Sequence, residues 1–213
     1  MKFEQLGNIK LYNADCMEVM KTFKDKQFSL AIVDPPYGIG LIKTKAGNWG
    51  IRKEAKGDMQ KDWDFQKPTK QYFDELFRVS KNQIIWGANH FIETLNKNSS
   101  CWIVWDKQNG TSYFADSELA YTSFDTAVRN FKMPTVRKDR IHECQKPIEL
   151  YKWLLDNYAK EGDTILDTHF GSLSIGIACH DLKFDLTAIE LDKDYYEMAK
   201  KRLINHQKQL TLF

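Results

Sequence analysis

Short apolar runs alternate with amphipathic segments along this chain, which predicts an α/β protein. Phe73, Leu76 and Phe77 have helical spacing, whereas the continuous apolar run 28–33 is typical of a buried strand. Strands are expected at 9–13, 28–33, 83–86, 101–105, 118–124, 164–167 and 185–190. Helices are expected at 15–23, 70–80, 147–158, 173–181 and 194–207, with a short one ending at 95. This alternation indicates a doubly wound sheet with helices on both faces, whose ligands bind beyond the carboxyl ends of the strands.

Two segments lack this periodicity. Residues 38–65 are rich in Gly, Lys and Asn and are predicted to form a long mobile loop. Residues 125–144 are polar and expected to be irregular. With 213 residues, the whole chain 1–213 is expected to form a single domain.

Composition adds little to this picture. Hydrophobic residues make up 42% and charged residues 28%, which is ordinary for a globular chain. The four cysteines lie far apart without a C-x-x-C pair, which argues against a zinc site or a disulfide framework and fits a reducing cytoplasm. No signal core and no stretch long enough to span a bilayer is found in the sequence, so a cytoplasmic location is expected.

The net charge of +2 does not indicate a nucleic-acid partner, but the basic residues are unevenly distributed. They concentrate in the two irregular segments, where basic side chains can contact phosphates or form a solvated surface. The candidate DNA-contacting residues are Lys43, Lys45, Arg52, Lys53, Arg137, Lys138 and Arg140.

The tetrapeptide Asp34-Pro35-Pro36-Tyr37 directly follows the apolar run 28–33. The two prolines fix φ and lack N–H donors, and the residue before each proline is kept out of the helical conformation. The Asp34 carboxylate and the neighbouring carbonyls are therefore expected to face a ligand beside the ring of Tyr37. These groups suit a planar heterocycle that carries an amino group. An ordinary turn is the alternative, since Pro and Asp are common turn residues.

A second constellation lies where the strand 164–167 runs through a small-residue turn into a helix. Gly171 allows close backbone approach at the helix N-terminus. The next strand ends at Glu190, and an acid roughly 20 residues after such a turn holds the two hydroxyls of a ribose. This arrangement predicts a nucleoside cofactor, with a generic βαβ unit as the alternative. The residues concerned are Asp167, Thr168, His169, Phe170, Gly171, Ser172, Glu190 and Leu191.

Together these motifs resemble the S-adenosylmethionine (SAM)-dependent amino-methyltransferases of DNA. Because the tetrapeptide precedes the cofactor turn, the chain resembles the circularly permuted β group, which includes many phage and mobile-element adenine methylases. The segments 12–16, 86–91 and 145–150 also match family segments near the cofactor adenine, the target base and the cofactor methionine, respectively.

The resemblance implies a Rossmann-like class I methyltransferase sheet. It also implies that SAM is the cofactor and that Asp15, Cys16 and Lys146 join the cofactor-binding residues above. No metal is implied. The usual turn of the family reads Asp-Pro-Phe-x-Gly-Ser-Gly-Thr, whereas Thr168, His169 and Leu173 depart from it here. His169 is expected to cover the cofactor, and Leu173 to narrow its methionine site.

The implied reaction is methylation of adenine N6 in double-stranded DNA, in a restriction-modification system or by an orphan phage methylase. Asp34 and the Pro35 carbonyl are expected to accept hydrogen bonds from the amino group, while Tyr37 stacks on the flipped base. Asp34, Pro35, Pro36 and Tyr37 are thus the candidate catalytic residues. The family places target recognition within 125–144, which is short here and suggests a short site or help from a second subunit in a homodimer.

The tail 209–213 resembles the peptide with which bacterial replication proteins bind a sliding clamp. The residues concerned are Gln209, Leu210, Leu212 and Phe213; folding back of these apolar side chains onto the domain is the alternative.

Three alternative functions remain. Methylation of cytosine N4 is the first, although that chemistry more often uses Ser in place of Asp34. Methylation of glutamine in a protein is the second, but those enzymes usually carry Asn there and place the cofactor turn before the tetrapeptide. The third is a catalytically weak cofactor- or clamp-binding regulatory module, which only Leu173 supports.

Overall fold

The computed structural model describes residues 2–39, 41–43, 49–51, 66–110, 115–135, 141–142 and 144–210. Within these residues, nine strands form one mixed sheet in the order β1-β2-β11-β10-β3-β6-β8-β7-β9. The strands are β1 (Glu4–Leu6), β2 (Ile9–Asn13), β3 (Phe28–Val33), β6 (Ser80–Trp86), β7 (Trp102–Asp106), β8 (Ser117–Thr122), β9 (Arg129–Lys132), β10 (Thr164–Asp167) and β11 (Asp185–Glu190).

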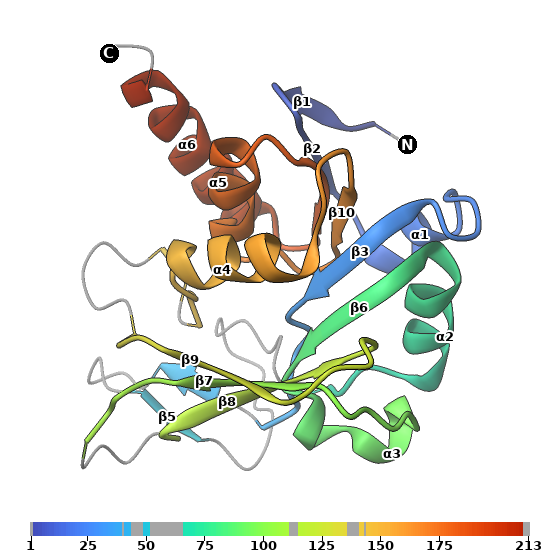
Figure 1. Cartoon of the computed structure of the whole chain (residues 1–213). Helices are drawn as coiled ribbons and strands as arrows, with labels where there is room; N and C mark the ends of the chain where they lie inside the picture. Colours follow the sequence, from blue (N-terminus) through green and yellow to red (C-terminus); the bar gives the residue numbers. More distant parts are fainter. Residues whose placement is uncertain are drawn as a thin grey trace.

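Helices cover both faces of the sheet, so the predicted doubly wound α/β class is confirmed (Figure 1). One face carries α1 (Cys16–Met20), α2 (Lys70–Val79) and α3 (Ile92–Leu95), with the 3-10 turn η1 (Ala88–His90) before α3. The other face carries α4 (Ile148–Tyr158), α5 (Ser174–Asp181) and α6 (Lys193–Leu210).

The alternation of side chains along each strand produces two hydrophobic cores. In β3, Leu30 and Ile32 belong to the core beneath α4 and α5, whereas Ala31 and Val33 belong to the core beneath α1 and α2. Because β3 buries both of its faces, its sequence reads as a continuous apolar run instead of an alternating one.

The five central strands β2, β11, β10, β3 and β6 run parallel. Their carboxyl ends therefore meet at one edge of the sheet. The last two strands of the chain, β10 and β11, lie between β2 and β3, which are consecutive in sequence. The N-terminal tetrapeptide and the C-terminal turn are thus brought to neighbouring strand ends.

The two irregular segments contain strands that the sequence pattern did not predict. In the segment 38–65, β4 (Leu41–Lys43) and β5 (Trp49–Ile51) pair as an antiparallel two-stranded sheet. In the segment 125–144, β9 pairs in parallel with β7 at the edge of the main sheet. Because an edge strand leaves most of its side chains exposed, the sequence of β9 is polar and lacks the apolar pattern that predicts a strand.

Several element boundaries also differ from the prediction. Helix α1 begins at Cys16 instead of residue 15, because the Asp15 carboxylate caps it by accepting the N–H groups of Met17 and Glu18. Helix α6 continues to Leu210, so Gln209 and Leu210 belong to the helix and not to a separate tail. No helix in the described part of the chain is long and apolar enough to cross a membrane.

Candidate active site

Three acidic residues stand at the carboxyl ends of three adjacent parallel strands. Asp34 follows β3, Asp167 ends β10 and Glu190 ends β11. Burial raises the pKa of Asp167, and the charges of Asp34 and Glu190 raise it further. The structure thus brings the predicted catalytic motif and the predicted cofactor turn into one electrostatic environment.

The Asp34 carboxylate has a charged partner on one oxygen and a hydroxyl on the other. Lys146 Nζ lies 2.5 Å from Asp34 Oδ2, and the Tyr37 hydroxyl donates to Asp34 Oδ1 at 2.8 Å. Lys146 precedes α4, and its side chain is only 2% exposed. Its ammonium therefore points to the predicted catalytic carboxylate, although the sequence suggested a place beside the cofactor.

Glu118 on β8 is a second acid in contact with this lysine. Its Oε2 lies 3.0 Å from Lys146 Nζ, and its Oε1 lies 2.5 Å from Lys107 Nζ. Burial alone would raise the pKa of Glu118, but the two lysines lower it to about 2. Burial likewise opposes the charge on Lys146, yet Asp34 and Glu118 raise its pKa above the ordinary value, so both groups are ionised at neutral pH.

The ring of Tyr37 is held in place by Gly87 and His90. It stacks on the His90 imidazole with ring centroids 5.1 Å apart and an interplanar angle of 20°. A Cβ on Gly87, whose φ is +68°, would lie 2.1 Å from Tyr37 Cε1, so this position requires glycine. Burial, together with the charges of Asp34 and Glu118, raises the pKa of the Tyr37 hydroxyl well above its ordinary value.

On the cofactor side, the Glu190 carboxylate is held by backbone N–H groups. Gly171 N donates to Glu190 Oε2 and Asp192 N donates to Glu190 Oε1, both at 2.9 Å. Burial raises the pKa of Glu190 in spite of these bonds. Each carboxylate oxygen has a second lone pair, so Glu190 retains the capacity to accept two hydroxyl groups. Leu191 follows it and is 69% exposed.

Asp167 is the most perturbed acid of the site. It is buried and accepts the N–H of His169 at 3.0 Å, while burial raises its pKa to about 8. A buried carboxyl group with so high a pKa becomes ionised when a cation is placed next to it. The site is therefore suited to a ligand that carries positive charge.

Neutral side chains line the turn after β10. His169 lies 3.8 Å from Cys16 Sγ through Nε2, and burial lowers its pKa to about 4, so the ring is uncharged at neutral pH. Thr168 hydrogen-bonds the Tyr72 hydroxyl at 2.7 Å. Cys16 and His169, both predicted to bind the cofactor, are thus in contact, whereas the Asp15 carboxylate caps α1.

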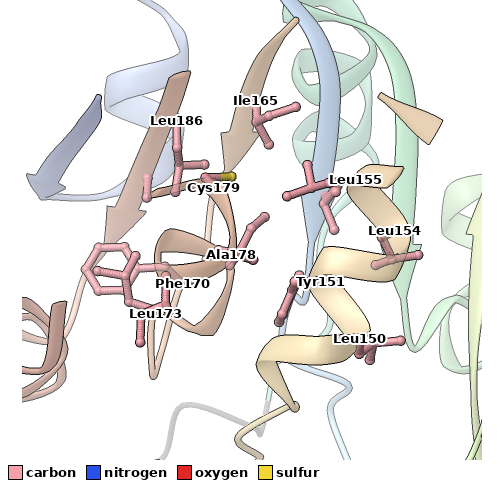
Figure 2. Close-up of a cluster of buried hydrophobic side chains, with 14 of the residues drawn as sticks. Leu150, Tyr151, Leu154, Leu155, Ile165, Phe170, Leu173, Ala178, Cys179 and Leu186 are labelled. Atoms are coloured by element: carbon pink, nitrogen blue, oxygen red, sulfur yellow. The ribbon is translucent and has the colours of Figure 1, made fainter. Parts of the chain in front are cut away.

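Two residues of this turn belong to the core. Phe170 and Leu173 are 5% and 1% exposed, and Figure 2 shows both side chains within the buried apolar cluster. Leu173 has a φ of 56°, a left-handed conformation that costs a non-glycine residue on the order of 1 kcal/mol. A Cβ on Gly176 would lie 2.6 Å from Leu173 Cγ, so the leucine packs over a position without a side chain. The Leu173 side chain therefore packs into the core, which does not support the expectation that it narrows the methionine site.

Sequence reasoning missed the residues that support these groups from other elements. Glu118 and Lys107 extend the ion pairs of Lys146, and Tyr72 on α2 reaches the cofactor turn. Arg202 on α6 donates to the Ser172 carbonyl at 2.7 Å. No local motif marks these residues, although Glu118 is a charged residue within a predicted strand, which is a weak sign of a buried pair.

Most of the candidate DNA-contacting residues lie outside the part of the chain that the structure describes. Lys43 lies in β4, where only the backbone is described. The other six, Lys45, Arg52, Lys53, Arg137, Lys138 and Arg140, lie outside the described residues, as do Leu212 and Phe213 of the tail.

Comparison with known proteins finds similarity to DNA methylases. A family model described as DNA methylase (N6_N4_Mtase) matches residues 129–201. The Type II methyltransferase M2.MboI of Moraxella bovis is 23% identical over 239 residues, covering 92% of this chain and 87% of that protein.

Two solved structures share the fold. The M1.HpyAVI–SAM complex has a TM-score of 0.60 and 20% sequence identity, covering 92% of this chain and 100% of that one. The PvuII DNA methyltransferase, described as cytosine-N4-specific, has a TM-score of 0.63 and 10% identity, covering 96% and 93% of the two chains. The predicted Rossmann-like class I methyltransferase sheet is therefore confirmed as the fold of this protein.

Proposed function

We propose that this protein transfers a methyl group from SAM to the N6 amine of an adenine flipped out of double-stranded DNA. The observation that carries the proposal is the placement of Asp34-Pro35-Pro36-Tyr37 at the end of β3, next to the end of β10 with Asp167 and one strand away from the end of β11 with Glu190. The methylase family match and the Type II methyltransferase relative support the enzyme class and DNA as the substrate.

The residues present fit SAM as the cofactor. Glu190 would accept the two ribose hydroxyls, and Leu191 would cover the adenine with its exposed side chain. Asp167 would face the positive charge of the methionine part, and the uncharged ring of His169 does not repel that charge. When bound, SAM supplies a methyl group on a sulfonium, whose carbon–sulfur bond breaks with the electron pair left on sulfur. Asp15, Cys16, Lys146, Thr168, Phe170, Gly171 and Ser172 stay predicted members of this site.

Asp34 and Pro35 activate the amine in this proposal. The lone pair of an adenine amino group is delocalised into the ring, which makes the nitrogen a poor nucleophile. Hydrogen bonds from its two hydrogens to the Asp34 carboxylate and the Pro35 carbonyl would draw it toward a pyramidal geometry and offset the positive charge that develops on it. After the nitrogen has bound the methyl carbon, it loses one of these hydrogens as a proton, which is released to solvent water.

Tyr37 is the proposed stacking partner of the base. Stacking on an aromatic ring contributes about 1–3 kcal/mol per base, comparable to the cost of unstacking a flipped nucleotide. His90 already stacks on the Tyr37 ring, and the base would extend or replace that stack.

Adenine is favoured over cytosine by Asp34, because the related cytosine chemistry more often uses Ser at this position. The fold does not distinguish the two targets, since the cytosine-N4-specific PvuII enzyme shares it. The regulatory alternative loses its only support, because Leu173 is packed in the core.

Four further assignments belong to the proposal. Circular permutation of the β group is consistent with the insertion of β10 and β11 between β2 and β3. The single domain 1–213, target recognition by 125–144 with DNA contacts from the basic residues, and a cytoplasmic location stay predictions. So do a homodimer and binding of a bacterial sliding clamp through Gln209, Leu210, Leu212 and Phe213.

Asp34→Ala tests the proposal. We expect a loss of about 10²- to 10³-fold in methyl transfer to DNA, because the variant removes the acceptor that acts on the reacting nitrogen. Mass spectrometry of nucleosides from plasmid incubated with enzyme and SAM reports the rate and the modified base together. SAM affinity, measured by calorimetry, should change little. A variant that methylates at a near wild-type rate, or a product other than N6-methyladenine, would contradict the assignment.

A further inference from the structure

Arg202 of α6 reaches the turn that follows β10. Its Nη1 donates to the Ser172 carbonyl at 2.7 Å and to the Ser174 hydroxyl at 3.1 Å. A terminal guanidinium nitrogen carries two hydrogens, so this one nitrogen can serve both acceptors. The two serines flank Leu173, which means that the arginine holds the chain on either side of that residue.

Leu173 is the strained point of the turn. Its φ of 56° is left-handed, a conformation that a bulky side chain rarely adopts, and no described side chain caps α5 at this residue. Its N–H donates to the Phe170 carbonyl at 2.7 Å, and its carbonyl accepts the N–H of Gly176 at 3.0 Å. Leu173 therefore joins the turn to the helix, and a change in its φ would displace both.

The position of the Arg202 guanidinium is electrostatically unfavourable. The N-terminus of a helix carries partial positive charge and repels a cation, and Nη1 lies at the first residue of α5. The side chain is half-buried, and burial lowers the pKa of Arg202. Within the part of the chain that the structure describes, Arg202 forms no ion pair, and Glu149 of α4 contributes only charge attraction. The hydrogen bonds to the turn are therefore the direct contacts that offset these costs.

The same turn places an N–H group on the proposed ribose acceptor. Gly171, one residue before Ser172, donates its N–H to Glu190 Oε2 at 2.9 Å. Relaxation of the chain at Leu173 would shift Gly171 and weaken this bond. Glu190 would then lose one of the contacts that orient its carboxylate.

We infer that Arg202 is a positioning residue for the cofactor: by bonding both neighbours of Leu173, it keeps the left-handed turn in the geometry that orients Glu190. The inference rests on the proposed function, because it takes the turn after β10 as part of the SAM site. Glycine would adopt the left-handed conformation without strain, whereas leucine needs the turn to be held by another element.

The test is a double-mutant cycle of Arg202→Met with Leu173→Gly, measured as the Kd for SAM by calorimetry. Arg202→Met should raise the Kd about 10-fold, as expected when charged hydrogen bonds that hold a site are lost. In the Leu173→Gly background, where the left-handed conformation is unstrained, the same substitution should raise it less than about 3-fold. Equal factors in both backgrounds would overturn the inference, as would an Arg202→Met Kd within about 2-fold of wild type.

Two substitutions separate this role from a general effect of charge. Lys201→Met removes a cation from the neighbouring, exposed position of α6 and should leave the Kd unchanged. Glu149→Gln removes the acid that attracts Arg202 and should leave the Kd unchanged as well. A rise in either variant as large as that of Arg202→Met would overturn the inference, because charge alone would then account for it.

Hydrogen exchange in the free protein tests the same contact without cofactor and without Leu173→Gly. The Gly171 amide should exchange about 10-fold faster in Arg202→Met than in wild type, because the turn opens more often. The Met17 amide, which also donates to a carboxylate, is the matched reference and should keep its wild-type rate. An unchanged Gly171 rate, or equal acceleration of both amides, would overturn the inference. A wild-type protein that binds no SAM, with Gly171 responding as expected, would support the hold on the turn and refute the proposed function.

Discussion

The carboxylates of Asp34 and Asp167 lie at the ends of neighbouring strands, but their surroundings differ. Asp34 is paired with the buried ammonium of Lys146, which Glu118 supports in turn. Asp167 accepts a backbone N–H, and burial raises its pKa to about 8. The acid at the end of β3 is thus paired with a cation of the protein, whereas the acid at the end of β10 has only a backbone N–H as its hydrogen-bond partner among the described residues.

The difference follows from the ligands that each end is proposed to receive. An adenine is neutral, so a bare carboxylate beside it would be costly to bury, and Lys146 offsets that cost. SAM brings a sulfonium and an ammonium, so the protein gains from leaving acidic groups without cations where that ligand binds. Charge arrangement alone thus distinguishes the proposed target side from the proposed cofactor side.

Removal of the built-in cation should have the largest effect. Lys146→Met leaves the partly buried Asp34 and Glu118 without the buried cation that they share, which is expected to lower the free energy of unfolding by about 3–5 kcal/mol. Chemical denaturation measures this loss. Lys152→Met, which breaks the more exposed pair with Asp181, should cost less than about 1 kcal/mol. Equal losses in the two variants would show that burial does not set the strength of the Lys146 pairs.

Removal of the proposed ribose acceptor should weaken cofactor binding with less effect on stability. Glu190→Ala deletes the carboxylate that holds Gly171 and Asp192, and we expect the Kd for SAM to rise about 10- to 100-fold. Isothermal titration calorimetry reports the change, with Glu161→Ala as an exposed control. An unaltered Kd would place the ribose elsewhere.

The pH dependence of SAM binding, with a small effect at each step of pH, should be the most direct comparison of the two ends. Asp167 holds its proton below about pH 8 in the free protein and must lose it to face a cation, so affinity should fall as pH decreases from about 7.5 to 5.5. The decrease should not exceed tenfold per pH unit, and the α-amino group of the cofactor, with a pKa of about 7.7–8.0, stays predominantly charged in this range. His169, with a pKa of about 4, does not titrate there.

Asp167→Asn is the variant that isolates this group. It should remove most of the slope and bind SAM more weakly than wild type at pH 7.5. If the slope persists in Asp167→Asn, another group such as Glu190, whose pKa is also raised by burial, accounts for the dependence.

The central part of the fold was predictable from the sequence because its strands are buried on both faces. The runs 28–33, 164–167 and 185–190 appear unchanged as β3, β10 and β11. The edge strand β9 was not predicted, since most of its side chains are exposed and show no alternating pattern. The short pair β4–β5 was not predicted either.

The approach of Asp34, Asp167 and Glu190 was also predictable, because parallel strand ends share one edge of a sheet. The contacts that surround Asp34 were not. Lys146 is 112 residues away in sequence, and its choice between the cofactor and Asp34 depends on how the segment before α4 packs. The contact of Glu118 with Lys146 depends on the same packing, and no local spacing in the sequence predicts it.

The packing of Leu173 over Gly176 restricts how this turn can diverge among homologous proteins. A methyl group at 176 would collide with the leucine, so alanine or serine is admissible there only after 173 has become smaller. The two positions should therefore covary, with loss of bulk at 173 expected before a side chain appears at 176.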